Sequence, residues 1–133
     1  MDVELSIPIL TDADIVRARQ QGREVASQLT FTPSDLTVIA SAISELARNI
    51  FSYAGHGEIV VGLVERNGRR GVKIVARDEG PGIRDVDLAL QDGYSTSGSL
   101  GLGLPGVRRL VDEFEIRTQL DVGTEITLRK WAR

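Results

Sequence analysis

The chain has 133 residues, a formal net charge of −3 at pH 7 and a sequence pI of about 5.2, a balance that argues against a nucleic-acid partner. It contains no cysteine, which excludes disulfides and thiolate metal sites, and a single histidine, which excludes a multi-histidine site. No apolar run approaches the ~20 residues of a membrane span, and the start "MDVELSIPIL" lacks the pattern of a signal peptide. We therefore expect one globular domain over residues 1–133, without membrane contact and located in the cytoplasm.

The first part of the chain predicts a short strand followed by two helices. Residues 3–9 are β-like, and Thr11 with acidic residues directly behind it is typical of a helix start. This first helix is expected to reach about Leu29. Thr32 and Pro33 then provide a second helix start, and apolar residues at helical period extend that helix to about Tyr53.

The rest of the chain predicts two hairpins separated by helical and glycine-rich segments. Asn67–Gly68 stands between two β-rich runs and is the preferred pair for a tight hairpin turn. A short helix is expected over Asp85–Gln91, a longer one from about Leu104 to Glu113, and a closing hairpin that turns at Asp121–Gly123. Helices and hairpins are segregated along the chain rather than alternating. We therefore expect an α+β fold with an antiparallel-rich sheet covered on one face.

Glu45 and Asn49, in "SELARN", lie four residues apart and therefore share one face of the second predicted helix. On a helical wheel this face points away from the apolar stripe, which favours a solvated polar surface. The alternative is a chemical role, because a carboxylate can accept a proton from a hydroxyl and an amide oxygen is a suitable ligand for Mg²⁺. Asparagine is also a poor helix former, which weakens the purely structural explanation.

Asp78, in "VKIVARDEGPGI", continues the inward-facing row of the strand that begins at Val72. A carboxylate on the core side needs a partner, because burying an unpaired charge is costly. Asp78 therefore either opens a turn where the strand has ended or accepts a hydrogen bond from a ligand such as a purine amino group. In the second case Gly80 and Gly82 would let the backbone pass close to that ligand.

The segment "DGYSTSGSLGLGLPGVRRL" places five glycines immediately before and within the start of a predicted helix. One interpretation is a flexible surface loop. The other is a loop that leads phosphates to the N-terminus of the helix, where Gly101 and Gly103 would expose backbone N–H groups.

Two further polar residues carry weaker signals. Thr124 shares its strand parity with Ile126 and so faces inward, where its hydroxyl can bond the backbone or a bound base. His56 is expected to be an ordinary residue of a surface loop, because nothing nearby in the sequence would orient it for catalysis.

Taken in order, "ELARN", "DEGPG", "GLGL" and "GTE" resemble the four nucleotide-binding boxes of the GHKL ATPase/kinase superfamily, which includes gyrase B and the histidine kinases. The resemblance covers roughly residues 5–131. It implies the Bergerat fold, an α+β two-layer sandwich with helices on one face of a mixed, mostly antiparallel sheet and ATP held between the layers.

The resemblance also implies a role for each box. Glu45 would be the catalytic residue, Asn49 the Mg²⁺ ligand and Asp78 the acceptor for the adenine amino group. Residues 92–100 would form a lid over ATP. The remaining nucleotide-binding residues that it implies are Gly80, Gly82, Ile83, Ser97, Gly101, Leu102, Gly103, Leu104 and Thr124.

At 133 residues we expect neither a dimerisation helix with a phospho-accepting histidine nor a transducer domain with a catalytic lysine. The stand-alone serine kinase branch remains, and "DGYSTSGSLGLGLPGVRRLVDEFEI" resembles the switch-protein kinases of bacterial stressosomes. That resemblance implies ATP-dependent phosphorylation of STAS-domain partners and, after release, binding and activation of a PPM-type phosphatase. The alternatives are an anti-sigma factor kinase that sequesters a sigma subunit and a non-catalytic ATP-dependent binding module.

Overall fold

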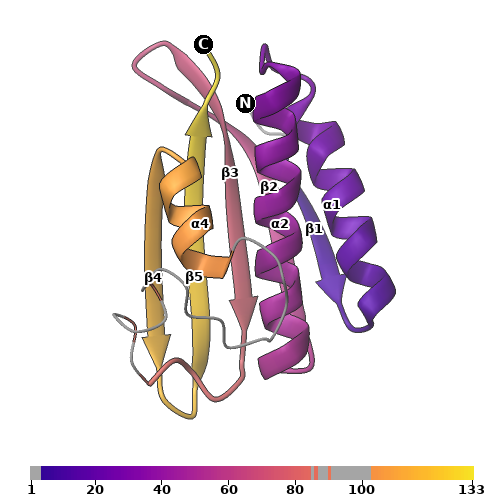
Figure 1. Cartoon of the computed structure of the whole chain (residues 1–133), viewed down its shortest axis with the longest axis vertical. Helices are drawn as coiled ribbons and strands as arrows, with labels where there is room; N and C mark the ends of the chain where they lie inside the picture. Colours follow the sequence, from indigo (N-terminus) through magenta and orange to yellow (C-terminus); the bar gives the residue numbers. More distant parts are fainter. Residues whose placement is uncertain (1–3, 85, 87–89, 91–102) are drawn as a thin grey trace.

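The computed structural model describes residues 4–84, 86, 90 and 103–133 of the chain. The strands and helices pack in two layers, a sheet and a layer of helices (Figure 1). In chain order they are β1 (Glu4–Ile9), α1 (Asp12–Ala26), α2 (Pro33–Tyr53), β2 (Gly57–Arg66), β3 (Arg69–Asp78), α4 (Gly103–Leu110), β4 (Glu113–Gln119) and β5 (Gly123–Trp131).

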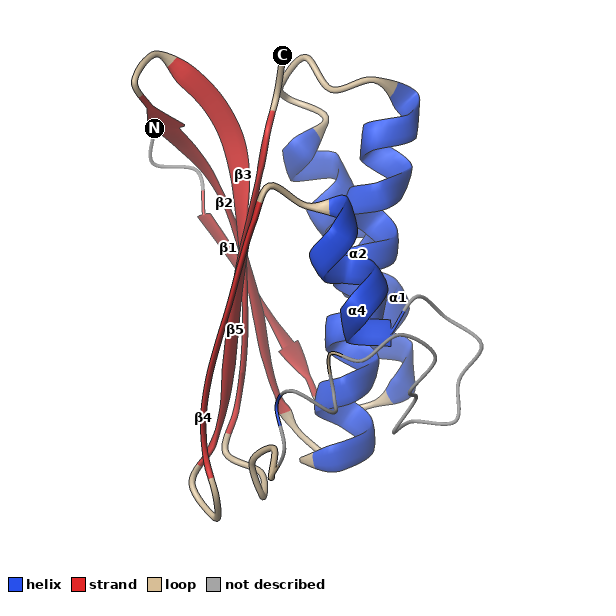
Figure 2. Ribbon diagram, turned by 60° about the vertical axis from the view of Figure 1, so that its left-hand side comes forward, coloured by secondary structure: helices blue, strands red, loops and turns tan. Residues whose placement is uncertain are grey.

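The five strands form one sheet in the order β1-β2-β3-β5-β4, and α1, α2 and α4 all lie on one of its faces (Figure 2). This arrangement confirms the predicted α+β class. The expected mixed sheet is wrong for the described strands, because every neighbouring pair is antiparallel. For β1 and β2 the reason is visible in their connection: α1 and α2 run in opposite directions and return the chain to the end of β1 (Figure 1).

The core lies between the helices and the inward-facing row of each strand. On β3 this row is Val72, Ile74 and Ala76, all buried as the alternating pattern predicts. From the helical layer, Ile39, Ile43, Leu46 and Ile50 of α2 and Val107 of α4 complete the contact. None of the helices in the described part of the chain combines the length and hydropathy needed to span a membrane.

Local signals placed most element starts correctly. Thr11 and Thr32 are the N-caps of α1 and α2, and Thr32 accepts a hydrogen bond from the Asp35 backbone N–H at 3.1 Å. Asn67 and Gly68 form the hairpin turn with φ of 53° and 81°. Such positive values are the conformation that this residue pair tolerates.

Two predicted helix ends were too late. Instead of reaching about Leu29, α1 ends at Ala26, because the next residues form tight turns in which N–H groups bond the carbonyl three residues back. Likewise α4 spans Gly103–Leu110 rather than reaching Glu113. Glu113 instead begins β4, where it pairs with Arg129 of β5.

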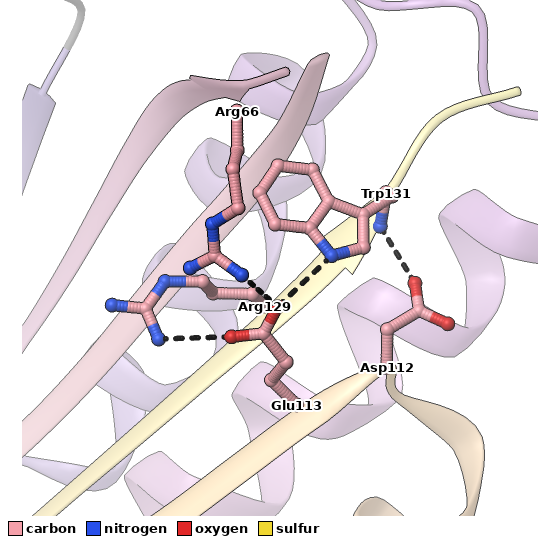
Figure 3. Close-up of polar contacts among 5 residues, drawn as sticks. All are labelled: Arg66, Asp112, Glu113, Arg129 and Trp131. Atoms are coloured by element: carbon pink, nitrogen blue, oxygen red, sulfur yellow. Dashed lines mark hydrogen bonds and ion pairs between the residues drawn. The ribbon is translucent and has the colours of Figure 1, made fainter. Parts of the chain in front are cut away.

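The end of the sheet near the C-terminus is fastened by Trp131 on the helix-free face. Its indole N–H donates to Glu113 at 3.1 Å, and Arg66 donates to the same carboxylate at 2.6 Å (Figure 3). This hydrogen bond from Arg66 is the main cause that lowers the pKa of Glu113 below its ordinary 4.5. The guanidinium groups of Arg66 and Arg69 lie 5.0 and 5.8 Å from the ring centroid of Trp131, so the ring is buried although no helix covers it.

Candidate active site

Asp78 and Thr124 face each other across the sheet at the end opposite Trp131. They are register partners between β3 and β5, and the same row continues to Gly57 on β2 and to Thr118 on β4. Thr124 is buried and Asp78 half-buried, on the face that the helices cover. Two residues that are 46 positions apart (78 and 124) are thereby brought side by side.

The glycines around Asp78 permit a close backbone approach. Gly80 donates its N–H to the Asp78 carboxylate at 2.8 Å, which closes a tight turn after β3. A Cβ placed on Gly82, whose φ is +81°, would lie 2.6 Å from the carbonyl oxygen of Gln119, and one on Gly123 would lie 2.1 Å from that of Asp78. Only glycine fits at these two positions without displacing the backbone.

Thr118 is the residue of this site that the sequence analysis missed. Its hydroxyl lies 2.9 Å from that of Thr124 and accepts the Ile83 backbone N–H at 2.9 Å. It thus fixes the loop that follows β3 onto β4 and β5. The signal was present, because Thr118 has the same strand parity as Phe114 and Ile116, the arrangement that singled out Thr124.

The prediction that Glu45 lies on a solvated polar face is wrong, because the structure buries this residue. Its side chain is only 3% exposed, and Arg48 donates to the carboxylate at 2.9 Å. Asn49, four residues further along the same helix, is half-buried. The wheel assumed one buried stripe, but α2 contacts α1, the sheet and α4, so more than one of its faces is covered.

The C-terminal end of α2 is in direct contact with the Asp78 loop. A Cβ on Gly80 would lie 2.6 Å from the Cβ of Ala54, the C-cap of α2. A Cβ on Gly57 would lie 2.7 Å from Ile50 and 3.2 Å from the Cβ of Asp78. The helix that carries Glu45 and Asn49 therefore packs directly against the strand end that carries Asp78, and no side chain fits between them.

The glycine-rich segment is described only from Gly103 onward. Gly103 begins α4 with φ of +67°, a conformation that favours glycine, and Leu104 is buried in the next position. Ser97, Gly101, Leu102 and the predicted lid at 92–100 lie outside the described residues. Of the short helix expected at 85–91, Val86 and Leu90 are described, and the Leu90 N–H donates to the Val86 carbonyl at 3.0 Å.

A cavity of about 670 Å³ opens at the same end of the sheet. Five of its lining residues form one row of the helix-free face: Pro8, Glu58, Arg77, Glu125 and Arg117. The lining also includes Asp78, Thr118 and Thr124, but neither Glu45 nor Asn49. The cavity thus lies mainly on the helix-free face and reaches the predicted nucleotide site only at its Asp78 and Thr124 edge.

Three charged side chains of the cavity wall, Glu58, Arg77 and Glu125, are paired with one another. Arg77 donates to Glu125 at 2.8 Å and to Glu58 at 3.4 Å, and the bond to Glu125 is the main cause that raises the Arg77 pKa above its ordinary value. His56 is exposed at the rim, as expected of a surface loop residue.

Comparison with known proteins places this geometry in a family. A model of the histidine kinase-like ATPase domain matches residues 10–130. The chain is 51% identical over 133 residues to the serine/threonine-protein kinase RsbT of Bacillus subtilis (strain 168), across the whole of both chains. It is 34% identical over 110 residues to the anti-sigma F factor of Bacillus thuringiensis (strain Al Hakam), which covers 79% of this chain and 75% of that protein.

Solved structures agree on the fold. The mycobacterial sensor histidine kinase MprB superposes with a TM-score of 0.56 at 22% identity, over 98% of this chain and 99% of that one. A chain of the SiaB–SiaC complex from Pseudomonas aeruginosa gives 0.58 at 17% identity, over 98% and 89%. The chain therefore belongs to the histidine kinase-like ATPase family, whose members use ATP, and within it to the serine/threonine protein kinases of the partner-switching type.

Proposed function

We propose that the chain transfers the γ-phosphoryl group of ATP to a serine or threonine of a STAS-domain partner, with Glu45 as general base. The observation that carries this proposal is the buried Glu45 carboxylate on α2, the helix whose C-terminal end contacts the Asp78 loop. The full-length similarity to a serine/threonine-protein kinase supports the same activity.

Adenine would be recognised at the end of β3 and β5. The Asp78 carboxylate accepts one backbone N–H from Gly80 and has capacity for further donors, such as the amino group of adenine. The hydroxyls of Thr118 and Thr124 lie beside it in the register row and offer further donors and acceptors. A base without the amino group would leave this acceptor unpaired, which gives selectivity for adenine.

The phosphates would be bound by backbone N–H groups at Gly101 and Gly103, with Ile83, Ser97, Leu102 and Leu104 completing the pocket. The amide oxygen of Asn49 would hold Mg²⁺, an ion usually bound by one or two protein ligands together with substrate phosphates. Asn49 fits this role because it is half-buried on α2, one turn from Glu45. When bound, the ion would neutralise phosphate charge that otherwise repels the incoming hydroxyl.

In the transfer step Glu45 would accept the proton of the partner's hydroxyl. A bond forms between the hydroxyl oxygen and the γ-phosphorus, the bond to the bridging oxygen breaks, and ADP leaves with that electron pair. A general base of this kind contributes about 10² to 10⁴-fold to the rate.

The test is incubation of the chain with γ-labelled ATP, Mg²⁺ and a STAS-domain protein, followed by mapping of the labelled residue. Glu45→Gln should slow label transfer by about 10² to 10⁴-fold while ATP binding persists, and Asp78→Asn should weaken ATP binding itself. Glu24→Gln, on the exposed side of α1, is the matched control and should transfer at the wild-type rate. Wild-type transfer by Glu45→Gln would contradict the assignment of the base.

The class of partner protein that the chain binds distinguishes a switch-protein kinase from an anti-sigma factor. Release from the STAS protein would allow binding and activation of a PPM-type phosphatase, as expected of a switch protein. The 34% identity to an anti-sigma F factor favours sequestration of a sigma subunit as the second candidate. Pull-down with the three partner classes decides: capture of a sigma subunit without capture of STAS proteins would favour the second candidate over the first.

A further inference from the structure

Arg48 is the side chain that the structure places on the Glu45 carboxylate. Its Nη1 donates to Oε2 of Glu45 at 2.9 Å, with the two residues three apart on α2. The carboxylate side chain is 3% exposed and the arginine side chain 34% exposed. The guanidinium group therefore reaches from solvent to a carboxylate that solvent itself barely contacts.

Glu45 requires such a donor because of its place in the helix. A buried carboxylate without hydrogen bonds is costly. In the middle of α2 the backbone N–H groups are used by the helix, so they cannot satisfy a side chain. Asp14 provides the contrast: at the start of α1 it accepts the free N–H groups of Leu10 and Thr11 in addition to its bond from Arg17.

We propose that Arg48 is a positioning residue that holds the Glu45 carboxylate in the orientation needed to accept the proton of the phospho-acceptor hydroxyl. This inference rests on the proposed function, in which Glu45 is the base. A general base must lie within hydrogen-bond reach of the proton it removes, so its rotamer decides the rate. An arginine fixed at one carboxylate oxygen restricts that rotamer while the other oxygen can serve the substrate.

An arginine and a lysine at position 48 would hold the Glu45 carboxylate differently. Arginine presents several N–H donors in a planar fork, whereas lysine is a point charge on a flexible stem. Arg48→Lys should therefore keep a positive charge beside Glu45 but hold the Glu45 carboxylate less firmly in its orientation. The transfer rate of Arg48→Lys should therefore lie between those of the wild type and Arg48→Ala. An ion pair with only a structural role would not produce this order of transfer rates.

The test is a double-mutant cycle on label transfer from ATP to a STAS-domain protein. Arg48→Ala should lower kcat by about 10 to 10²-fold, with the KM for ATP unchanged, and Arg48→Lys should fall between it and the wild type. In the Glu45→Gln background, Arg48→Ala should add no further loss, because the group that it positions is already gone.

The matched control is Arg17→Ala, which removes an arginine at the same i,i+3 spacing from the buried Asp14. It should lower the melting temperature and leave kcat unchanged. Circular dichroism and ATP binding confirm that each Arg48 variant is folded before its rate is compared. An unchanged kcat in Arg48→Ala, or losses that multiply in the double variant, would overturn the positioning role while Glu45 remained the base. Full activity of Glu45→Gln would instead overturn the base itself, and the positioning role with it.

Discussion

At the residue scale, Gly82 and Gly68 have the same backbone conformation but different surroundings. Both have φ of +81°, yet a Cβ on Gly68 meets nothing within 4 Å, whereas one on Gly82 would lie 2.6 Å from the carbonyl oxygen of Gln119. The first position needs glycine only for its turn. The second also needs it because the backbone of the loop after Asp78 touches the backbone at Gln119.

We expect this difference to appear in stability. Gly68→Ala should lower the free energy of unfolding by about 1–2 kcal/mol, the cost of a left-handed conformation for an L-residue. Gly82→Ala should cost clearly more, because the β4–β5 hairpin must also move away. Urea unfolding followed by circular dichroism measures both, and equal losses would show that the hairpin accommodates the extra methyl group freely.

At the element scale, the start of α1 depends on the ionised form of Asp14. Its carboxylate accepts the backbone N–H of Leu10 at 2.8 Å and of Thr11 at 3.0 Å, and Arg17 pairs with it. The bond from Leu10 is the largest cause, and together these contacts lower the pKa of Asp14 from 3.8 to about 2. The lowered pKa means that folding favours the charged carboxylate.

The stabilisation of α1 by Asp14 should therefore depend on pH. Asp14 contributes its full stabilisation above its unfolded pKa of 3.8, and this contribution is lost as the pH falls towards about 2. Asp14→Asn cannot titrate. The difference between the unfolding free energies of wild type and Asp14→Asn should therefore shrink when urea unfolding is repeated from neutral pH down to about pH 2. A difference that stays constant with pH would mean that the charge of Asp14 does not stabilise α1.

At the scale of the whole molecule, one end of the sheet holds the stabilising contacts of Trp131 and the other holds the predicted nucleotide site. Trp131 pairs with Gly71 at one end and Thr124 with Asp78 at the other, seven residues along the strand, or roughly 23 Å. Trp131 connects β5 and the Glu113 end of β4 to the β2–β3 hairpin (Figure 3). The predicted nucleotide site lies at the opposite end of the sheet.

Loss of this fastening should cost stability without altering the chemistry. Trp131→Ala should lower the free energy of unfolding by about 3 kcal/mol or more, the usual cost of removing a buried large aromatic side chain. Trp131→Phe should retain most of the packing and lose less. Circular dichroism in urea measures the stability, and label transfer at low temperature measures the rate of the folded fraction. A lowered kcat in the folded fraction would show that the two ends are coupled.

The local features could be predicted from the sequence because short-range chemistry decides them. The N-caps Thr11 and Thr32, the Asn67–Gly68 turn and the inward row that ends at Asp78 each depend on residues within a few positions of one another. The order of the four boxes identified the family for the same reason, since each box is a contiguous segment.

Only the tertiary structure decided which polar groups meet. The sequence could not show that Glu45 is buried and paired with Arg48, because its burial depends on the elements that pack around α2. Nor could it show that Thr118 lies against Thr124, or that Gly123 leaves space for the carbonyl of Asp78, because these contacts depend on the strand order β3-β5-β4. Burial and pairing between distant segments are properties of the packed sheet and helices, whereas caps and turns are properties of the local chain.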